Sequence, residues 1–590
     1  MRLVMRSCRV TSRESRAVQV MAEEWNTNLL ALVYGIGRGD LEFLGINDAG
    51  QLTIQFESAE IPIVRVIEKA GLSGSFNLRI PYLVAARARR VEEAFRAAIG
   101  KVGLAAAVLL AYPVKVSAYR LFLRTFLHAR SNYGLQVGSS NELKFVLSLD
   151  GLDNRLIVCD GVKTQSYLHL AERAVRKRYR VVITIGSVAD LTAIVDYPWT
   201  TRPEIALRLK AYSTVPGHWS HATGRHSKFG LAADEVKQVA QTLTDGSLTD
   251  TATTVMMHPG SQVQETSALA QFGEQIARVY LELREQGLDS LEVIDIGGGI
   301  PVDYTGTGAT TTPEAYAENL MRGVTEGLRE ASTEEIPRGF IVESGRYIMA
   351  PSSMVVVKII DVRSVYPSTP PTTPNAERTV KSLVARLRSA NSVEEIEGIL
   401  SSVEGEDHGK TLESMVQREV MLGMLVVAAR QRLAELGIDP PPSNTEFLKP
   451  RYLVTGEFSV FNSIIDHLIV DQYFPVIPVT RLRGRPRSTV RLVDMTCDSD
   501  GEISKFCLKN LDRVLLTEDF IPLTTRAPCI REGIPIPEIK SLQNSHVVIA
   551  LTGAYQDTVI SGQGMFARLP SVVLDVMDDG SWSVDVERSS

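Results

Sequence analysis

The sequence is poor in cysteine and contains no long hydrophobic run. Its five cysteines, in a chain of 590 residues, are scattered at positions 8, 159, 497, 507 and 529, and no two of them form a Cys-x-x-Cys pair. This pattern excludes a disulfide-stapled secreted scaffold and favours a reducing compartment. No apolar run reaches the ~18 residues that a bilayer-spanning helix needs. We therefore predict a cytoplasmic protein that does not cross a membrane.

A strong excess of charge of one sign is missing as well. The chain carries 63 lysines and arginines against 69 acids, which gives a net charge of −6. A nucleic-acid-binding protein is expected to carry a basic footprint, so we predict no nucleic-acid partner. Arginines do gather in the first twenty residues, where Glu14 is the one acid. We expect residues 1–24 to form a disordered or targeting tail, with organelle targeting by residues 1–20 the less favoured alternative.

Between residues 105 and 350, eight short apolar runs alternate with amphipathic helical patterns. This alternation predicts parallel strands, and eight strands in ~250 residues are the number that closes a (β/α)8 TIM-type barrel. An open, doubly wound sheet is the alternative. The predicted strands are Val108–Val116, Leu135–Val137, Leu156–Cys159, Val181–Ile185, Ile205–Leu209, Thr254–His258, Val293–Ile296 and Phe340–Val342. The predicted helices between them are Tyr119–Ala129, Glu142–Leu149, Tyr167–Lys177, Val188–Val195, Asp234–Leu243, Ser267–Glu285 and Pro313–Arg329.

The flanks of this repeat have a different pattern. Residues 25–104 combine short strands, separated by glycines, with a lead-in helix over Val84–Ile99. After the barrel, β-branched runs predict a C-terminal β domain made of residues 351–366 and 449–590. A helical insertion at 367–448 interrupts that domain, and its predicted helices are Thr379–Leu400 and Leu412–Leu436.

Lys115 follows an apolar run and stands at the predicted carboxyl end of the first barrel strand. Catalytic side chains of (β/α)8 enzymes lie at that end of the barrel. A lysine that can shed its proton in apolar surroundings is what a carbonyl cofactor needs to form an imine. The alternative is a strand-end lysine whose ammonium group reaches solvent.

Further polar residues follow the later strands. The triplet Gly297-Gly298-Gly299 could present backbone N–H groups to a phosphate, although such triplets also form plain tight turns. Arg346 could pair with the same phosphate, and Glu343 could keep a pyridine nitrogen protonated. His258 could stack on an aromatic ring, although a satisfied core histidine is the commoner outcome. Together with Lys115, these residues predict a site for pyridoxal 5′-phosphate.

A second cluster, Asp494–Gly501, follows a predicted strand near the C-terminus. Its acids surround Cys497 and disfavour the thiolate, so we expect this thiol to donate a proton. Asp498 and Asp500 could hold the cationic tail of a substrate. A calcium loop is the alternative, but the ligand spacing of an EF-hand is missing. Zinc bound by His218, His221 and His226 is disfavoured because no cysteine or acid lies at the usual spacing, and we predict no metal-ligating residues.

Several stretches together resemble the biosynthetic arginine decarboxylases, a branch of the pyridoxal-phosphate enzymes with an alanine-racemase-like barrel. The resemblance extends from about Trp25 to Val576, and the run through Cys497 and the helical insertion are specific to this branch. The barrel stretches alone also fit ornithine or diaminopimelate decarboxylases. The resembling stretches are Phe43–Asn47, Tyr112–Val116, Ser227–Leu231, His258–Gln262, Val302–Tyr304, Asp471–Pro475, Thr496–Gly501 and Gly553–Gln556.

The resemblance implies a role for each candidate residue. Lys115 would bind the cofactor as an imine, and His258 would stack on its ring. Glu343 would pair with the pyridine nitrogen, and Arg208 would lie near the cofactor rim. Cys497 would protonate the α-carbon and Asp498 would receive the far end of the substrate, both reaching the cofactor of a partner subunit. The residues implied to hold the phosphate are Ser261, Gly297, Gly298, Gly299, Arg346 and Tyr555.

The implied reaction is decarboxylation of a basic L-amino acid, with L-arginine converted to agmatine and carbon dioxide in polyamine biosynthesis. The resemblance also implies a homodimer or higher homo-oligomer with shared active sites and, in some relatives, magnesium. The chain departs from the family at Gln136, where relatives usually have an acid, at Ser117-Ala118 and at Gln563-Gly564. Decarboxylation of ornithine, lysine or diaminopimelate, and a catalytically weak regulatory subunit, therefore stay open as alternatives.

Overall fold

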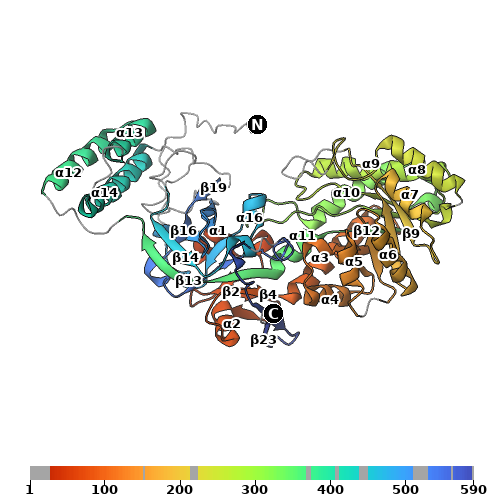
Figure 1. Ribbon diagram of the computed structural model, residues 1–590, viewed down its shortest axis with the longest axis horizontal. Coiled ribbons are helices and arrows are strands. Elements are labelled where there is room, and N and C mark those ends of the chain that lie inside the picture. The colour runs from red at the N-terminus through yellow and green to blue at the C-terminus, as the bar shows by residue number, and fades with distance from the viewer. Residues whose placement is uncertain are drawn as a thin grey trace.

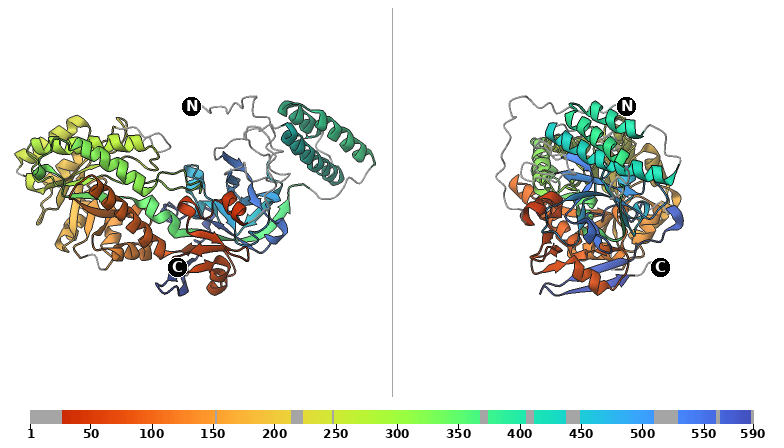
Figure 2. Two further views of the ribbon diagram at one scale, coloured as in Figure 1. Left: turned by 180° about the vertical axis from the view of Figure 1, so that it is seen from behind. Right: turned by 90° about the vertical axis from the view of Figure 1, so that its left-hand side faces the viewer.

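The protein consists of three bodies arranged in a row (Figure 1). A barrel lies at one end, a β domain in the middle and a small helical unit at the other end, and the left view of Figure 2 shows the same row from behind. Within the described residues, no helix is both long and apolar enough to cross a membrane. The computed structural model describes residues 27–150, 153–212, 223–246, 248–366, 374–404, 411–436, 449–508, 529–559 and 563–587.

Eight parallel strands close into a barrel, which confirms the predicted fold class and excludes the open sheet. The strands are β5 (Ala107–Pro113), β6 (Tyr133–Val137), β7 (Leu156–Cys159), β8 (Arg180–Ile185), β9 (Glu204–Leu209), β10 (Ala252–Met257), β11 (Val293–Asp295) and β12 (Gly339–Val342). The last strand, β12, returns to pair in parallel with β5. Short apolar runs form these strands because helices cover them outside and side chains fill the barrel inside.

Helices cover the outside of the barrel. They are α3 (Pro81–Lys101), α4 (Arg120–Ala129), α5 (Ser140–Val146), α6 (Gln165–Arg176), α7 (Val188–Asp196), α8 (Ala233–Asp245), α9 (Thr266–Glu285) and α10 (Pro313–Gly327). The lead-in helix α3 packs against both α4 and α10, so it completes the helical ring between the last strand and the first. Four of the helices begin at a hydroxyl side chain that accepts from a backbone N–H three residues on: Ser139, Thr164, Ser187 and Thr312.

Side chains inside the barrel change from apolar to polar along the strand direction. Strand side chains alternate between faces, so residues two apart point the same way. The apolar interior is formed by Ala111, Leu156, Val158, Val182, Ala206, Val293 and Ile341. Two residues further toward the carboxyl ends, the same alternation gives the buried or half-buried polar residues Asp160, Thr184, Arg208, Asp295 and Glu343, with Gln136 on β6. The strand pleat therefore gathers polar groups at one end of the barrel.

The β domain takes strands from both ends of the chain. β1 (Leu44–Ile46), β2 (Leu52–Gln55) and β3 (Glu60–Pro62) form a small antiparallel sheet. β4 (Phe76–Arg79) lies within the large sheet, between β13 (Ser353–Ser364) and β22 (Ser571–Val576). The other strands of the domain are β14 (Tyr452–Gly456), β15 (Val476–Pro478), β16 (Ser488–Val493), β17 (Glu502–Ile503), β18 (Lys505–Leu508), β19 (Cys529–Glu532), β20 (Ile534–Ile536), β21 (His546–Ile549) and β23 (Trp582–Glu587).

Short helices accompany these strands. The sequence predicts only strands and turns directly after Trp25, which is wrong, because Thr27–Tyr34 forms helix α1. Its residues Leu29, Leu30 and Val33 are buried and recur at helical spacing. The remaining short helices are α2 (Ile63–Ala70), α11 (Gly345–Met349), α15 (Val460–Ser463) and α16 (Asp466–Ile469). The predicted tail, residues 1–24, lies outside the described residues.

The helical unit consists of α12 (Pro374–Ser389), α13 (Val393–Glu404) and α14 (Leu412–Leu436). The prediction of one helix over Thr379–Leu400 is wrong, because Ser392 caps a new helix. Its Oγ accepts from Glu395 N at 3.2 Å, and the chain leaves helical geometry just before it.

The helical unit has an apolar core of its own. That core includes Leu387, Ile396 and Leu425, and it is separate from the core that the barrel and the β domain share. The two ends of the unit meet where β13 pairs with β14, and Val365 N donates to Arg451 O at 2.8 Å. The unit is therefore an insertion in the chain between two paired strands, β13 and β14.

Candidate active site

Lys115 lies on a short 3₁₀ turn, Val114–Val116, directly after β5. The sequence predicts that this lysine ends the strand in apolar surroundings. Both expectations are wrong: the strand ends at Pro113, and the Lys115 side chain is exposed. The physical reason is the turn, which buries the two flanking valines and directs the lysine out of the core.

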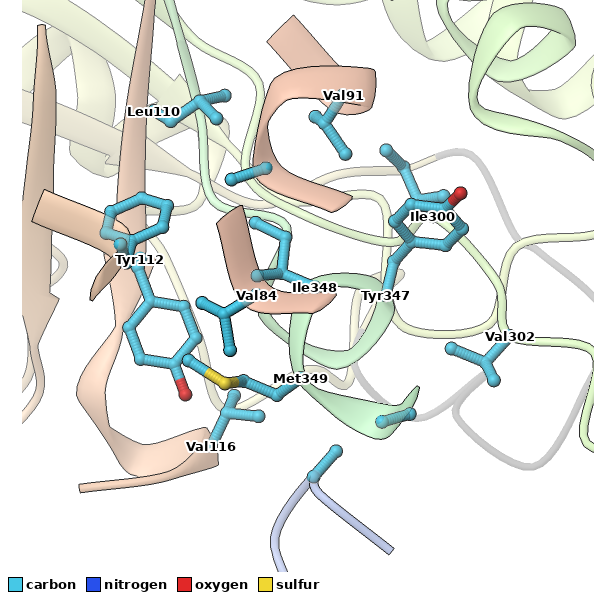
Figure 3. Close-up of a cluster of buried hydrophobic side chains, with 14 of the residues drawn as sticks. Val84, Val91, Leu110, Tyr112, Val116, Ile300, Val302, Tyr347, Ile348 and Met349 are labelled. Atoms are coloured by element: carbon cyan, nitrogen blue, oxygen red, sulfur yellow. The ribbon is translucent and has the colours of Figure 1, made fainter. Parts of the chain in front are cut away.

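The turn that carries Lys115 rests on an apolar base. Figure 3 shows Tyr112 and Val116 together with Ile348 and Met349 of α11, and all four side chains belong to the main core. The N-terminus of α11 comes so close that a Cβ on Gly345 would lie 2.6 Å from Val116 Cγ2. Only glycine fits at this contact, and the inner side of the turn is therefore fixed.

A segment of the β domain holds the same turn from the other side. Tyr555 N donates to Val116 O at 2.7 Å, and Thr558 Oγ1 donates to Lys115 O at 2.8 Å. Between them, Asp557 accepts two hydrogen bonds of 2.8 Å from Arg79 of β4. Lys115 and Thr558 are 443 residues apart in the chain, so the turn is where barrel and β domain are joined.

His258 directly follows β10 and faces the glycine triplet. Gly260 N donates to His258 Nδ1 at 3.0 Å, and Gly298 N donates to Nε2 at 3.3 Å. Burial, followed by the positive charges of Lys115 and Arg208, lowers the pKa of His258 to about 3. A neutral ring has one acceptor nitrogen and can accept one of these two N–H groups, whereas a doubly protonated ring can accept neither, so the neutral ring fits this place.

The glycine triplet after β11 is packed too closely for side chains. A Cβ on Gly297 would lie 2.8 Å from the His258 ring, and a Cβ on Gly298 would lie 2.6 Å from Glu343 O. Gly299 has φ +114°, and a Cβ on it would lie 2.9 Å from Tyr316 Oη. Backbone atoms without side chains therefore line this edge of the site, as a bound phosphate requires.

Two buried carboxyls lie side by side at the ends of β11 and β12. Asp295 is 1% exposed and Glu343 is 6% exposed. Asp295 Oδ1 accepts from Gly297 N at 2.9 Å, yet burial raises the pKa of Asp295 to about 7. Burial, followed by the charge of Asp295, raises the pKa of Glu343 well above its usual range. Among the described residues, Glu343 Oε1 has no hydrogen-bond partner.

A third acid at this end of the barrel is ionised. Asp160, directly after β7, forms an ion pair with Arg208 of β9, and Thr184 Oγ1 donates to its other carboxylate oxygen at 2.8 Å. Although burial acts to raise it, the charges of Arg208 and Lys163 hold the pKa of Asp160 below its usual range. The inward-facing acids thus have opposite tendencies: the pKa of Asp160 is lowered by neighbouring cations, whereas the pKa of Glu343 is raised by burial.

Arg346 brings a positive charge to the site from α11. It donates to Tyr304 Oη at 3.3 Å, and its guanidinium lies 4.6 Å above the Tyr555 ring. Ser261 is half-buried in the loop after β10, next to Gly260, whose φ is +109°. A fixed guanidinium with polar neighbours suits an anionic ligand.

The residues at this end of the barrel fit a bound pyridoxal phosphate. Within the described residues, the oxygens Glu343 Oε1 and Gln136 Oε1 are buried without a partner, and such atoms are rare unless a ligand or water satisfies them. Glu343 suits a ring nitrogen, and the bare backbone of Gly298 with Arg346 suits a phosphate. The exposed amine of Lys115 suits an aldehyde.

Comparison with known proteins agrees with this geometry. Residues 88–350 match the family described as pyridoxal-dependent decarboxylase, pyridoxal binding domain. A biosynthetic arginine decarboxylase of Bacteroides thetaiotaomicron is 24% identical over 583 residues, covering 94% of this chain and 89% of that protein. Another, of Escherichia coli strain K12, is 26% identical over 590 residues, covering 94% and 85%. The crystal structure of a biosynthetic arginine decarboxylase from Campylobacter jejuni has a TM-score of 0.74 at 22% identity, covering 94% of this chain and 89% of that one.

The chain is similar to the biosynthetic arginine decarboxylases over most of its length. The resemblance seen in the sequence motifs is therefore confirmed, as is the identification of a pyridoxal-phosphate-dependent decarboxylase. The match to the family covers the barrel, and the similarity to these decarboxylases extends over 94% of the chain, so it includes parts outside the barrel.

The cysteine loop that the resemblance to these decarboxylases singles out lies in the β domain, between β16 and β17. Asp494 shapes the loop, because its Oδ1 accepts from Thr496 N and its Oδ2 accepts from Val460 N, both at 2.8 Å. Cys497 is exposed. The same loop carries Asp498, which is half-buried, and Asp500, which is exposed. The three candidates therefore share one loop of the β domain.

Sequence reasoning missed Asp160 and Asp295, although a signal for both existed. Each lies two residues beyond an inward-facing apolar residue of its strand, Val158 and Val293. Within the described residues, no group of three or more His, Cys, Asp or Glu side chains could hold a metal ion. Of the histidines considered for zinc, His218 and His221 lie outside the described residues.

Proposed function

We propose that this chain decarboxylates a basic L-amino acid with bound pyridoxal 5′-phosphate, and that the substrate is L-arginine and the products agmatine and carbon dioxide. The observation that carries the proposal is Glu343, a buried carboxyl with an unpartnered oxygen at the end of the barrel that holds Lys115. An acid opposite the pyridine nitrogen keeps the ring cationic, which favours loss of carbon dioxide over racemisation. Arginine is favoured because the curated relatives named above are arginine decarboxylases.

Each residue at the barrel end would hold one part of the cofactor. Lys115 would bind its aldehyde, and the neutral His258 ring would lie against its ring face. Gly297, Gly298 and Gly299 would offer backbone to the phosphate. Ser261, Arg346 and Tyr555 would complete the phosphate site, with Arg208 near the rim.

Bound pyridoxal phosphate supplies an electron sink for the electron pair that remains on the substrate α-carbon when carbon dioxide leaves. Glu343 would then act through charge: burial raises its pKa in the cofactor-free protein, and as a carboxylate it would stabilise a proton on the ring nitrogen. The low pKa of His258 keeps its imidazole ring uncharged, so the imidazole would not repel the protonated pyridine ring of the cofactor.

A partner subunit would complete the site. Cys497 would donate the proton to the α-carbon, and Asp498, with Asp500 beside it, would bind the cationic end of the substrate. The exposure of Cys497 supports this arrangement, because a shared loop has to be open to the partner. The active protein would then be a homodimer or a higher homo-oligomer. Polyamine biosynthesis as the pathway, magnesium as a second cofactor and a cytoplasmic location stay predictions.

A substrate panel tests the proposal. Cofactor-loaded protein is incubated with arginine, ornithine, lysine and diaminopimelate, carbon dioxide is measured, and an absorbance scan detects the imine at Lys115. We expect arginine to be preferred, and Lys115→Ala to lose the imine absorbance and to slow the reaction by on the order of 10³-fold.

Lys144→Ala, which alters an exposed lysine of α5, is the matched control and should change neither readout. Release of carbon dioxide from ornithine, lysine or diaminopimelate alone would replace arginine as the substrate. No release from any of the four would refute the decarboxylase and favour a regulatory subunit.

A further inference from the structure

At the carboxyl end of the barrel, one arginine side chain faces three acidic side chains with which it could form an ion pair. The inward-facing side chains of that end include one arginine, Arg208, and three acids, Asp160, Asp295 and Glu343. A guanidinium pairs strongly with any carboxylate it can reach. Arg208 pairs with Asp160, and the charge of Arg208 is still felt by both Asp295 and Glu343. Its choice of partner decides whether Glu343 keeps a free oxygen.

Asp160 is fixed in place from several directions. Its N–H donates to Val137 O of β6 at 2.8 Å, and Tyr167 Oη donates to its carbonyl oxygen at 2.8 Å. Thr184 Oγ1 of β8 holds the carboxylate at 2.8 Å. The next residue, Gly161, has φ +81°, and a Cβ there would lie 2.2 Å from a backbone oxygen. Contacts from β6, α6 and β8 thus fix both the backbone and the carboxylate of Asp160, so the carboxylate has one defined position beside Arg208.

We infer that Asp160 is a positioning residue, which holds Arg208 away from Glu343 so that Glu343 stays available to the pyridine nitrogen of the cofactor. The inference rests on the proposed function, because it assigns Glu343 to that nitrogen. It explains why Glu343 Oε1 has no partner among the described residues although Arg208 points into the same end of the barrel.

The charges around Glu343 agree with this role. The groups that act on it are Asp295, Asp160, Lys115 and Arg208. Of the three acids, Asp160 is the one held ionised, so it is the stronger attractor for a guanidinium in the cofactor-free protein. Once Glu343 ionises beside a ring nitrogen, it becomes an equal attractor, and only the fixed pairing with Asp160 prevents Arg208 from turning to it.

The test is the substitution Asp160→Asn, which keeps the shape and the acceptor for Thr184 but removes the charge. Cofactor-stripped protein is titrated with pyridoxal phosphate, and the dissociation constant is measured by absorbance. We expect Arg208 to turn to Glu343 and the dissociation constant to rise roughly 10- to 100-fold, the size of a lost charged hydrogen bond.

The matched control is Glu204→Gln. It breaks the Arg180–Glu204 ion pair of 2.8 Å, which joins β8 and β9 at the opposite, amino end of the barrel. This variant loses a comparable charged pair between barrel strands but should bind the cofactor as the wild type does.

A double substitution separates positioning from a general structural role. In a Glu343→Gln background the cofactor-binding carboxylate is already gone and cannot be captured by Arg208, so adding Asp160→Asn should cause no further loss of cofactor affinity. An equal loss in both backgrounds would overturn the inference, and so would a wild-type dissociation constant in Asp160→Asn alone. If the wild type itself binds no pyridoxal phosphate, the proposed function fails instead.

A second variant covers the case in which Asp160→Asn does not fold. Thr184→Val loosens the Asp160 carboxylate without removing its charge, and we expect a smaller, roughly threefold rise in the dissociation constant. An unchanged constant in folded Thr184→Val would then count against the role of Asp160.

Discussion

At the scale of single residues, Asp295 links the site to the stability of the fold. Burial raises its pKa to about 7, whereas a carboxyl in an unfolded chain titrates near ~3.9. Between these values the unfolded chain ionises while the folded chain keeps its proton, so rising pH favours unfolding. The stability that this group contributes is fully present below pH ~4 and is lost as the pH rises to about 7. Glu343 acts in the same direction.

Asp295→Asn should therefore flatten the pH dependence of stability. Asparagine does not titrate. The free energy of unfolding of the cofactor-free variant, relative to that of the wild type, should therefore rise by up to roughly 1 kcal/mol per pH unit between pH 5 and 7. Urea unfolding of both proteins at several pH values measures the difference. A difference in free energy of unfolding between wild type and Asp295→Asn that stays constant from pH 5 to pH 8 would contradict the prediction.

Residue chemistry was readable from the sequence where a motif carries it. Lys115 stands in a stretch that resembles a known family, Glu343 and the glycine triplet follow predicted strands, and the structure brings all of them to one end of the barrel. Asp160 and Asp295 were missed because their inward direction follows from strand register, and a shift of one residue reverses the direction of every side chain. The exposure of Lys115 was missed for a related reason, since the strand gives way to a turn two residues before it.

At the scale of elements, capping decides where helices begin. Ser392 Oγ accepts from Glu395 N at the start of α13, and Glu395 Oε2 in turn accepts from Asn391 N at 2.7 Å. The reciprocal bonds satisfy backbone groups that a single continuous helix would have paired internally.

Ser392→Ala should loosen the helical unit. Loss of the cap is expected to lower the free energy of local unfolding by about 1 kcal/mol. Hydrogen exchange of α12, α13 and α14 measures this, because these helices have a core of their own. Ser402→Ala is the control: that hydroxyl donates to Ile399 O inside α13 at 2.7 Å and caps nothing. Equal effects of the two substitutions would argue against the cap.

Barrel elements were more predictable than flanking ones for a physical reason. A strand buried on both faces is a continuous apolar run, and such runs separate clearly from amphipathic helices. The break before α13 was missed because the apolar spacing continues across it, although Ser392 and Glu395 stand at capping-box spacing. The place of β4 inside the large sheet was also not visible in the sequence. Its partner strand β13 follows the whole barrel in the chain, so the pairing joins two segments that are far apart in the sequence.

At the scale of the whole molecule, the helical unit is the separable part. Barrel and β domain share one core, whereas α12, α13 and α14 pack around another. The paired ends of β13 and β14 are already joined by the hydrogen bond from Val365 N to Arg451 O.

Replacing residues 367–448 with a short glycine-containing turn should therefore leave the rest of the protein folded. A tight turn can connect two antiparallel strands whose ends meet. We expect the shortened protein to bind pyridoxal phosphate with unchanged affinity, measured by absorbance titration alongside thermal unfolding. Loss of cofactor binding in a shortened protein that still unfolds cooperatively would show that the unit supports the site.

The bond between Thr558 and Lys115 has a consequence for how the protein is made. The barrel strands end at Val342, but the turn that carries the lysine is clamped by residues about 200 positions later. At a synthesis rate of ~5–20 residues per second, roughly 10 to 40 seconds pass between the two. A nascent chain can close its barrel during that interval with the lysine turn still unclamped. Maturation of the site is therefore timed by the last part of the chain to leave the ribosome, and chains that stop early should carry a complete barrel without a finished site.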